Sequence, residues 1–157
     1  MVTVRDAVPE DLDAVAALTA QRRAAYEAVR PDFWRAAADA DRHGKSYLVQ
    51  LIDDTDVIVL VAETGDTLAG VLIGQPMNVP QVYDPGGPVY MIDDFTVSRP
   101  DYWTDRGAAL LDGFRTILRT RGVVRLIAVC GVHDDAKADL FREAGLTTVS
   151  AWWTAGL

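Results

Sequence analysis

The stretch Val89-Tyr-Met-Ile-Asp-Asp-Phe-Thr-Val97, followed by Ser98-Arg-Pro-Asp-Tyr-Trp-Thr-Asp-Arg-Gly-Ala-Ala-Leu-Leu111, decides how the rest of the chain is organised. Its first part is rich in β-branched and aromatic residues, which predicts a strand. Two adjacent carboxylates, Asp93 and Asp94, stand where a plain core strand has none, because burying a charge is costly. Apolar residues then recur at helical spacing from Gly107 onward, so the pattern predicts a strand, a turn and a helix.

The start of this helix, which we expect from about Thr104 to Thr120, is a candidate anion site. The first N–H groups of a helix have no partner within it, and the helix dipole is positive at that end. We therefore expect the turn over residues 102–107 to hold a phosphate. Carboxylates on a strand beside such a turn favour a site for a phosphorylated cofactor and an amine.

Length and charge limit the classes of function. The 157 residues are half apolar and about a quarter charged, which favours one globular domain over residues 1–157. A net charge of -8 argues against nucleic acid or an anionic membrane as the main partner, because both require clustered Lys and Arg. A cationic small molecule fits better, although acidic charge also serves solubility alone.

The first residues of the sequence predict where the protein is located, and its few Cys and His residues predict whether it binds a metal. The chain runs directly into a strand pattern without a signal-peptide core, and no apolar segment has membrane-spanning length, so we expect a cytoplasmic protein. Cys130, His43 and His133 form no metal-ligand spacing, and we expect no metal.

The remaining elements follow from hydrophobic periodicity and from Pro and Gly positions. In chain order we expect a strand at 2–6, a helix from 9 to about 30, short helices at about 32–41 and 45–52, a hairpin of strands 56–63 and 68–74 with its turn at 64–66, a loop at 75–88, a buried parallel strand at 123–130, a helix from 134 to 145, and a last strand at 146–153. This order predicts an α/β fold with a mixed sheet.

Aromatic residues outside these strands are candidate substrate contacts. Tyr26, Phe33 and Trp34 lie in the N-terminal helical region, where they either wall a substrate pocket or belong to the core. Tyr83 lies in the long loop that leads into the acidic strand, and loops of this length are often functional. Trp152 and Trp153 are expected to be core or dimer contacts, with a partner-binding role as a further alternative.

The order of elements resembles the GNAT superfamily of acetyl-CoA-dependent N-acetyltransferases over nearly the whole chain. In that family the fourth strand ends in a valine, and a pyrophosphate cradle of the form Arg/Gln-x-x-Gly-x-Gly/Ala precedes a Leu-Leu pair. The matching positions, without a gap, are Val97, residues 102–107 and Leu110-Leu111. Gly107 matches the cradle, Tyr102 replaces the Arg/Gln, and Asp105 replaces the first glycine.

Two further segments carry the resemblance. The family pattern Asn-x-x-x-x-x-x-Tyr-x-x-x-Gly-Phe corresponds to Asp134, Phe141, Gly145 and Leu146. Phe141 lacks the hydroxyl of the tyrosine that is the family's usual acid for the departing thiolate. Residues 92–97, Ile-Asp-Asp-Phe-Thr-Val, are similar to the Leu-Glu-Asp-Phe-Phe-Val strand of diamine acetyltransferases, in which the first acid handles the amine.

The resemblance implies a GNAT-like mixed, mostly antiparallel sheet flanked by helices, with one parallel strand-helix-strand unit. It implies transfer of acetyl from acetyl-CoA to the primary amine of a small, cationic metabolite, with a homodimer as a possible assembly. The implied cofactor-binding residues are Phe95, Thr96, Val97, Tyr102, Trp103, Thr104, Asp105, Arg106, Gly107, Ala108, Asp134 and Phe141. The alternative is a catalytically degenerate GNAT-fold acyl-CoA-binding or regulatory module.

The two carboxylates are the candidate catalytic residues. In a regular strand, neighbouring side chains point to opposite faces, so we expect only one of Asp93 and Asp94 to enter the cleft. The same alternation groups Asp93 with Met91, Phe95 and Val97 on one face. The likeness to diamine acetyltransferases assigns the amine to Asp93, which then accepts its proton. The alternative is that Asp93 only binds a loop backbone or pairs with an arginine.

Overall fold

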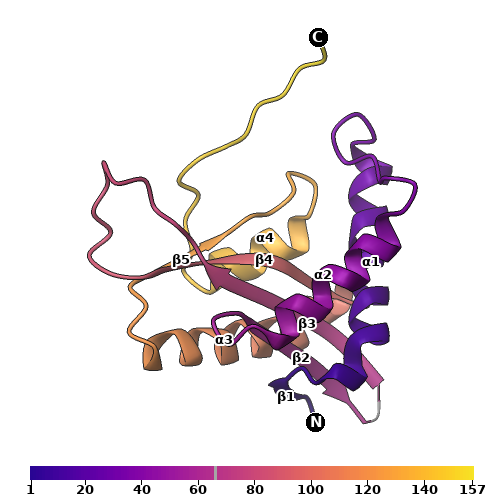
Figure 1. Ribbon diagram of the computed structural model, residues 1–157, viewed down its shortest axis with the longest axis horizontal. Helices are drawn as coiled ribbons and strands as arrows, with labels where there is room; N and C mark the ends of the chain where they lie inside the picture. Colours follow the sequence, from indigo (N-terminus) through magenta and orange to yellow (C-terminus); the bar gives the residue numbers. More distant parts are fainter. Residues whose placement is uncertain (66) are drawn as a thin grey trace.

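Five strands form one mixed sheet in the computed structural model, which describes residues 1–65 and 67–157. The strands lie side by side in chain order (Figure 1) as β1 (Thr3–Asp6), β2 (Ile58–Thr64), β3 (Thr67–Pro76), β4 (Val89–Val97) and β5 (Arg125–Ala128). Neighbours run antiparallel except β4 and β5, which are parallel. The predicted mixed sheet with one parallel unit is confirmed.

Two pairs of helices cover the two faces of this sheet. α1 (Leu12–Val29) and α2 (Ala40–Asp53) lie on one face, and α3 (Ala108–Thr120) and α4 (Asp135–Glu143) lie on the other. Alternate residues of the strands enter opposite cores, as the period of two requires. The α1/α2 core contains Val59, Val61, Val71 and Ile73, and the α3/α4 core contains Ile58, Leu60, Ala62 and Leu72.

The helical region between α1 and α2 differs from the prediction. Residues 31–39 form turns and irregular chain instead of a helix, and α2 begins at Ala40 instead of at about residue 45. The N–H groups of Phe33 and Trp34 both donate to the carbonyl of Arg30, at 3.1 and 2.8 Å, which closes a tight turn after α1. Pro31 begins this turn, because a proline disfavours helical geometry in the residue before it. The predicted hairpin turn at 64–66 includes Asp66, which lies outside the described residues.

The C-terminal part of the sheet is shorter than predicted. The strand predicted at 123–130 is present and parallel to β4, but β5 has only four residues and is partly exposed, so the predicted length and burial are wrong. The last strand predicted at 146–153 is absent, and residues 147–157 form exposed irregular chain that projects from the body (Figure 1). Gly145, at φ 80°, ends α4 as predicted, and the N–H of Leu146 donates to the carbonyl of Phe141 at 2.8 Å.

β4 departs from regular pairing at Asp93. Asp94 pairs with Ile73 and Ile92 pairs with Gly74, so Asp93 has no partner on β3. This is a β-bulge, in which one strand carries an extra residue. The alternation of side chains therefore changes phase in the middle of β4.

The bulge brings both carboxylates to the same face of the sheet. Asp94 contacts Arg22 of α1 and Asp93 contacts Tyr47 of α2, so both side chains point toward the α1/α2 layer. The opposite core holds the β4 residues Tyr90, Ile92, Phe95 and Val97. The prediction that Asp93 and Asp94 lie on opposite faces, with Asp93 beside Phe95 and Val97, is wrong because it assumed a regular strand.

No helix within residues 1–65 and 67–157 has both the length and the apolar character needed to cross a membrane.

Candidate functional site

The sheet opens between β4 and β5 halfway along β4. The last paired residues are Ile92 and Ala128, whereas β4 continues to Val97 and the chain after β5 turns away toward α4. On that side, the main chain of residues 93–97 has no strand partner in the described part of the protein. Unpaired backbone N–H and C=O groups are strong donors and acceptors, so this half of β4 is available to bind an extended ligand.

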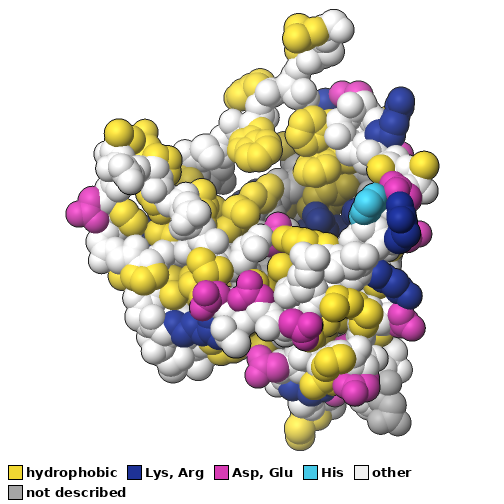
Figure 2. Space-filling model, viewed as in Figure 1, with side chains coloured by type: hydrophobic (Ala, Val, Ile, Leu, Met, Phe, Trp, Pro, Cys, Tyr) yellow, Lys and Arg dark blue, Asp and Glu magenta, His cyan; other side chains and the backbone are white. Residues whose placement is uncertain are grey.

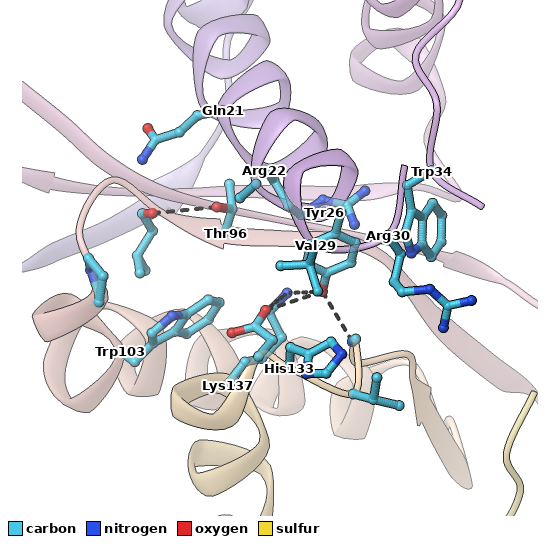
Figure 3. A pocket seen from close by; sticks show the side chains of 16 residues that line it. Gln21, Arg22, Tyr26, Val29, Arg30, Trp34, Thr96, Trp103, His133 and Lys137 are labelled. Carbon is cyan, nitrogen blue, oxygen red and sulfur yellow. Dashed lines mark hydrogen bonds and ion pairs between the residues drawn. The ribbon is translucent and has the colours of Figure 1, made fainter. Parts of the chain in front are cut away.

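A cavity of about 250 Å³ lies beside this opening (Figure 3). It is bounded by α1, the end of β4, the helical turns that follow β4, the loop after β5 and the start of α4. The lining residues are Gln21, Arg22, Ala25, Tyr26, Val29, Arg30, Trp34, Thr96, Val97, Pro100, Trp103, Gly131, Val132, His133, Asp134 and Lys137. The cavity thus combines apolar and aromatic walls with a few polar groups, which is typical of small-molecule sites.

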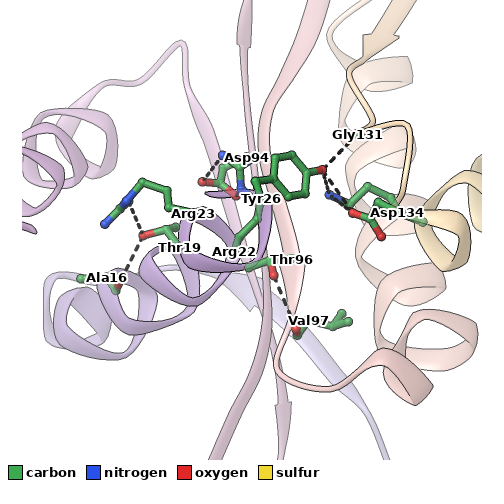
Figure 4. A network of polar contacts seen from close by, with 11 residues as sticks. Ala16, Thr19, Arg22, Arg23, Tyr26, Asp94, Thr96, Val97, Gly131 and Asp134 are labelled. Atoms are coloured by element: carbon green, nitrogen blue, oxygen red, sulfur yellow. Dashed lines mark hydrogen bonds and ion pairs between the residues drawn. The ribbon is translucent and has the colours of Figure 1, made fainter. Parts of the chain in front are cut away.

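A hydrogen-bonded cluster crosses the cavity from α1 to α4 (Figures 3 and 4). The hydroxyl of Tyr26 donates to the carboxylate of Asp134 at 3.1 Å and accepts from the N–H of Gly131 and from the ammonium of Lys137, both at 3.2 Å. Lys137 is only 2% exposed, and its nitrogen lies 3.0 Å from Asp134 and 5.1 Å from the ring of Trp103. The ammonium of Lys137, whose charge is balanced by Asp134, therefore lies at the wall of the cavity.

A second ion pair supports the same wall. The guanidinium Nε of Arg22 lies 2.8 Å from the carboxylate of Asp94, and a further hydrogen bond joins the two side chains at 3.2 Å (Figure 4). Burial raises the pKa of the Asp94 carboxyl above its ordinary value, and the charge of Arg22 opposes this rise. The carboxylate of Asp94 is therefore paired with the guanidinium of Arg22.

Asp93 has a different environment from its neighbour. The hydroxyl of Tyr47 donates to its carboxylate at 3.3 Å, and neither an arginine nor a loop backbone binds it in the described part of the chain. Burial and the charge of Asp93 raise the pKa of the Tyr47 phenol, so this donor stays protonated. Asp93 is thus a partly buried carboxylate that accepts its side-chain hydrogen bond from Tyr47.

The predicted phosphate turn is already helical. Helical turns begin at Pro100 and continue through Gly107 into α3, so the free helix start lies ahead of residues 102–107. The N–H groups of Tyr102 and Trp103 donate to the carbonyls of Arg99 and Pro100. The prediction that this turn supplies free N–H groups is wrong for these two residues.

Asp105 lies inside this helical segment, after its start. Its carboxylate accepts hydrogen bonds from the backbone N–H and the guanidinium of Arg106. Arg106 also stacks over Tyr102, with 3.8 Å between the guanidinium carbon and the ring centroid. The charge of Asp105 is therefore offset by Arg106.

Three predicted cofactor residues have a packing role. A Cβ at Gly107 would lie 2.7 Å from the Trp103 ring and 3.2 Å from Leu140, so glycine permits this close contact. The ring of Phe95 stands edge-on to Trp103 at 4.9 Å and lies 6.1 Å from Phe141. Phe141 is buried in the α3/α4 core and does not line the cavity, and its ring carries no hydroxyl that could donate a proton.

The structure brings together only some of the predicted site residues. Those that line the cavity are Tyr26, Trp34, Thr96, Val97, Trp103 and Asp134. Those that do not are Phe33, Tyr83, Asp93, Asp94, Phe95, Tyr102, Thr104, Asp105, Arg106, Gly107, Ala108 and Phe141. Tyr83 is 70% exposed on the β3–β4 loop, and Phe33 borders a second cavity formed with arginines of α1 and the following loop.

Residues absent from the prediction include Lys137, Arg22 and Gly131. Lys137 lies three residues after Asp134, a spacing that puts both on one side of a helix. Arg22 and Tyr26 are four residues apart on α1, so they also lie on one side of their helix. These spacings identify neighbours on a helix, but they do not show which side of the helix faces the cavity.

Solved structures share this fold, although the sequence alone finds no relatives. No family model matches the chain, and no curated protein matches it in sequence. A mutant of the BH1408 protein from Bacillus halodurans has a TM-score of 0.85 at 16% identity, over 99% of both chains. A predicted acetyltransferase from Clostridium acetobutylicum, solved with acetyl-CoA, has a TM-score of 0.78 at 12% identity, over 99% of this chain and 96% of that one. The aminoglycoside 6'-N-acetyltransferase of Acinetobacter baumannii has a TM-score of 0.72 at 12% identity, over 100% of this chain and 99% of that one.

Proposed function

We propose that this chain, whose fold is that of the GNAT acetyltransferases, moves an acetyl group from acetyl-CoA to the primary amine of a small, cationic metabolite. The observation that carries the proposal is the open half of β4 beside a cavity. An extended acyl-pantetheine arm carries amide groups along its length, and it matches a row of unpaired main-chain donors and acceptors. Acetyl-CoA supplies the thioester that the amine attacks.

The end of β4 orients the thioester. The main chain of residues 95–97 binds the pantetheine arm and polarises the thioester carbonyl, while Thr96 and Val97 line the cavity that receives the acetyl group. The pyrophosphate lies at the helix start near Pro100, where Arg99 and Arg106 provide positive charge. Each arginine already pairs with a neighbouring carboxylate, Asp101 and Asp105 respectively, which limits the affinity.

Proton transfers use side chains on both sides of the opening. Asp93 accepts the proton of the substrate ammonium, because it is the carboxylate on this face that no arginine neutralises. On the other side, the Tyr26 hydroxyl and the Lys137 ammonium stabilise the departing thiolate in place of Phe141. A thiol has a pKa near 8.5, so the thiolate is a tolerable leaving group at neutral pH.

A second candidate function is acyl-CoA binding without turnover. The burial of Phe141 in the core favours it, because the family's usual acid is missing from the cavity. The bonds of Tyr26 to Gly131 and Asp134 also favour it, since they join α1 to the wall opposite and must rearrange if a substrate passes between them.

Calorimetry followed by a thiol assay separates these two functions. We expect acetyl-CoA to bind with measurable heat, and we expect a panel of small amines to include some that release free CoA thiol. Binding without thiol release from any amine would support the second function. No heat and no thermal shift at millimolar acetyl-CoA would contradict both.

A further inference from the structure

The second cavity lies between α1 and the loop that follows it. It has a volume of about 300 Å³, and three arginines, three aromatic residues and three alanines line it. The arginines are Arg22, Arg23 and Arg35. The two cavities are neighbours, since Arg22, Tyr26 and Trp34 line both. This volume is at the lower end of the range of about 300–1,000 Å³ for small-molecule sites, so it suits a ligand of one or two rings.

Positive charge in this cavity is contrary to the composition of the chain. The chain has 23 acidic residues against 15 Lys and Arg, and its net charge is -8. Three arginines nevertheless meet here, and no acidic residue in the described part of the chain lines the cavity. In Figure 2, Lys and Arg side chains gather on the side of this face where α1 and the following loop lie, with hydrophobic side chains between them. Because low-dielectric walls strengthen the field of the charges that line a cavity, this one attracts an anion.

The three arginines differ in how far their charges are neutralised. Arg22 lies 2.8 Å from the buried carboxylate of Asp94. Arg23 lies 3.3 Å from Asp41, whose side chain is 91% exposed, so water weakens this pair. Arg35 is exposed and has no ion pair or hydrogen bond from its side chain to any of residues 1–65 and 67–157. The cavity therefore has one guanidinium free for a ligand and a second that is weakly paired.

The carboxylates on either side of Arg35 in the sequence do not neutralise it. Asp32 pairs with Arg30 at 2.8 Å, and Asp39 pairs with Arg42 at 2.7 Å. These local pairs direct the nearby negative charges to other arginines. The charge of Arg35 is thus left for a group from outside the chain.

Aromatic rings form the apolar part of the cavity. Phe33 is 43% exposed and Trp34 is 40% exposed. The two rings stand edge-on, with centroids 4.7 Å apart, and the Trp34 ring lies 5.5 Å from that of Tyr26. The alanines of the lining are small and leave space in front of these rings. Half-exposed aromatic rings at a cavity wall favour a flat apolar group, because rings pack edge-on or offset against one another.

We propose that the second cavity binds a small aromatic carboxylate, with its carboxylate on Arg35 and Arg23 and its ring against Phe33 and Trp34. A guanidinium is planar and donates two parallel hydrogen bonds to a carboxylate. A single negative charge fits better than a phosphate dianion, because only Arg35 has no partner of its own. The arginines repel the cationic amine of the proposed reaction, so this ligand is a different molecule, and its binding does not depend on acetyl transfer.

A titration of the full chain with benzoate, followed by NMR, tests the proposal. We expect the Trp34 indole N–H and the Arg35 Nε–H signals to shift, with a Kd of about 1 mM or lower for a ligand of this size. Benzamide retains the ring without the charge and is expected to bind at least about tenfold more weakly. Cyclohexanecarboxylate retains the charge without the aromatic ring and is expected to bind about threefold more weakly.

Two variants assign the contacts to residues. Arg35→Gln is expected to weaken benzoate binding at least about tenfold, because it removes the free guanidinium. Phe33→Ala removes one ring and is also expected to weaken it. Both side chains are exposed, so we expect unchanged circular dichroism. The control Arg119→Gln removes an exposed arginine of α3, on the other face of the sheet, and is expected to leave the affinity unchanged.

Four results would overturn the proposal. They are no shift at benzoate concentrations on the order of 10 mM, equal affinity in the wild type and the Arg35→Gln variant, shifts centred on residues 131–134 of the first cavity, and phenyl phosphate binding more tightly than benzoate. The last result would identify a phosphate site in place of a carboxylate site.

Discussion

The two halves of β4, which meet at the bulge at Asp93, belong to one strand and have different neighbours. Residues 89–92 lie between β3 and β5, and residues 93–97 pair with β3 alone. Most of the first half is apolar and buried, whereas the second half carries two carboxylates and the lining residues Thr96 and Val97. A strand that loses one neighbour partway along its length thus becomes a binding edge, because its main chain is left unpaired on that side.

The largest expected effect comes from removing the guanidinium of Arg22, which pairs with Asp94 on the open half of β4. Arg22→Ala leaves Asp94 partly buried without a counter-ion, and breaking a buried pair costs up to about 3–5 kcal/mol. We expect the free energy of unfolding in urea to fall substantially, and the double variant with Asp94→Asn to recover part of the loss. Arg23→Ala is the control, because its pair with the exposed Asp41 contributes at most about 1 kcal/mol. Equal losses in the Arg22 and Arg23 variants would show that the open half does not depend on this pair.

A smaller effect is expected in the paired half. A Cβ on Gly74, which pairs with Ile92, would lie 2.1 Å from the buried ring of Phe114. Gly74→Ala is therefore expected to lower the free energy of unfolding by about 1–3 kcal/mol while leaving acetyl-CoA affinity unchanged. Gly156→Ala, with no atom within 4 Å, is the control. A loss of affinity at unchanged stability would assign the paired half to the site.

The smallest expected effect is on catalysis alone. Asp93→Asn is expected to lower kcat/KM at least about tenfold, which is about 1.4 kcal/mol, without changing acetyl-CoA affinity. Asp94→Asn is the matched control on the same face, and it should change the rate much less because Arg22 already neutralises Asp94. Steady-state kinetics with calorimetry measures both quantities. If the Asp94 variant loses more activity than the Asp93 variant, the acceptor of the proton is Asp94.

The sequence predicts the elements with strong periodicity and not the irregularities that shape the site. The bounds of β4 agree with the prediction at both ends, because β-branched and aromatic residues are dense there and prolines precede it. The bulge at Asp93 is not predictable from that pattern, since it depends on the register with β3. The segment predicted as a last strand at 146–153 has the composition of a strand, but it pairs with no strand among the residues that the structure describes.

The candidate site is predictable in part, from the aromatic residues Tyr26 and Trp34 of the N-terminal helical region and from positions that the resemblance supplies. Thr96, Val97 and Trp103, for which the resemblance implies cofactor binding, line the cavity, and their binding of a cofactor stays a prediction. Lys137 was not predicted, because a lysine three residues after an aspartate is ordinary on a solvated helix. Its burial follows from packing under Trp103 and beside Tyr26, two residues that are far from it in sequence.

The most direct test of the account is the backbone amide spectrum of the protein during a titration with acetyl-CoA. We predict that the largest shifts occur at residues 94–97 of β4 and at residues 131–134 opposite, and that residues 89–92 shift little because both of their sides are already paired. Shifts centred on the second cavity beside Phe33, or no shifts at millimolar acetyl-CoA, would contradict the claim that the open half of β4 is the cofactor site.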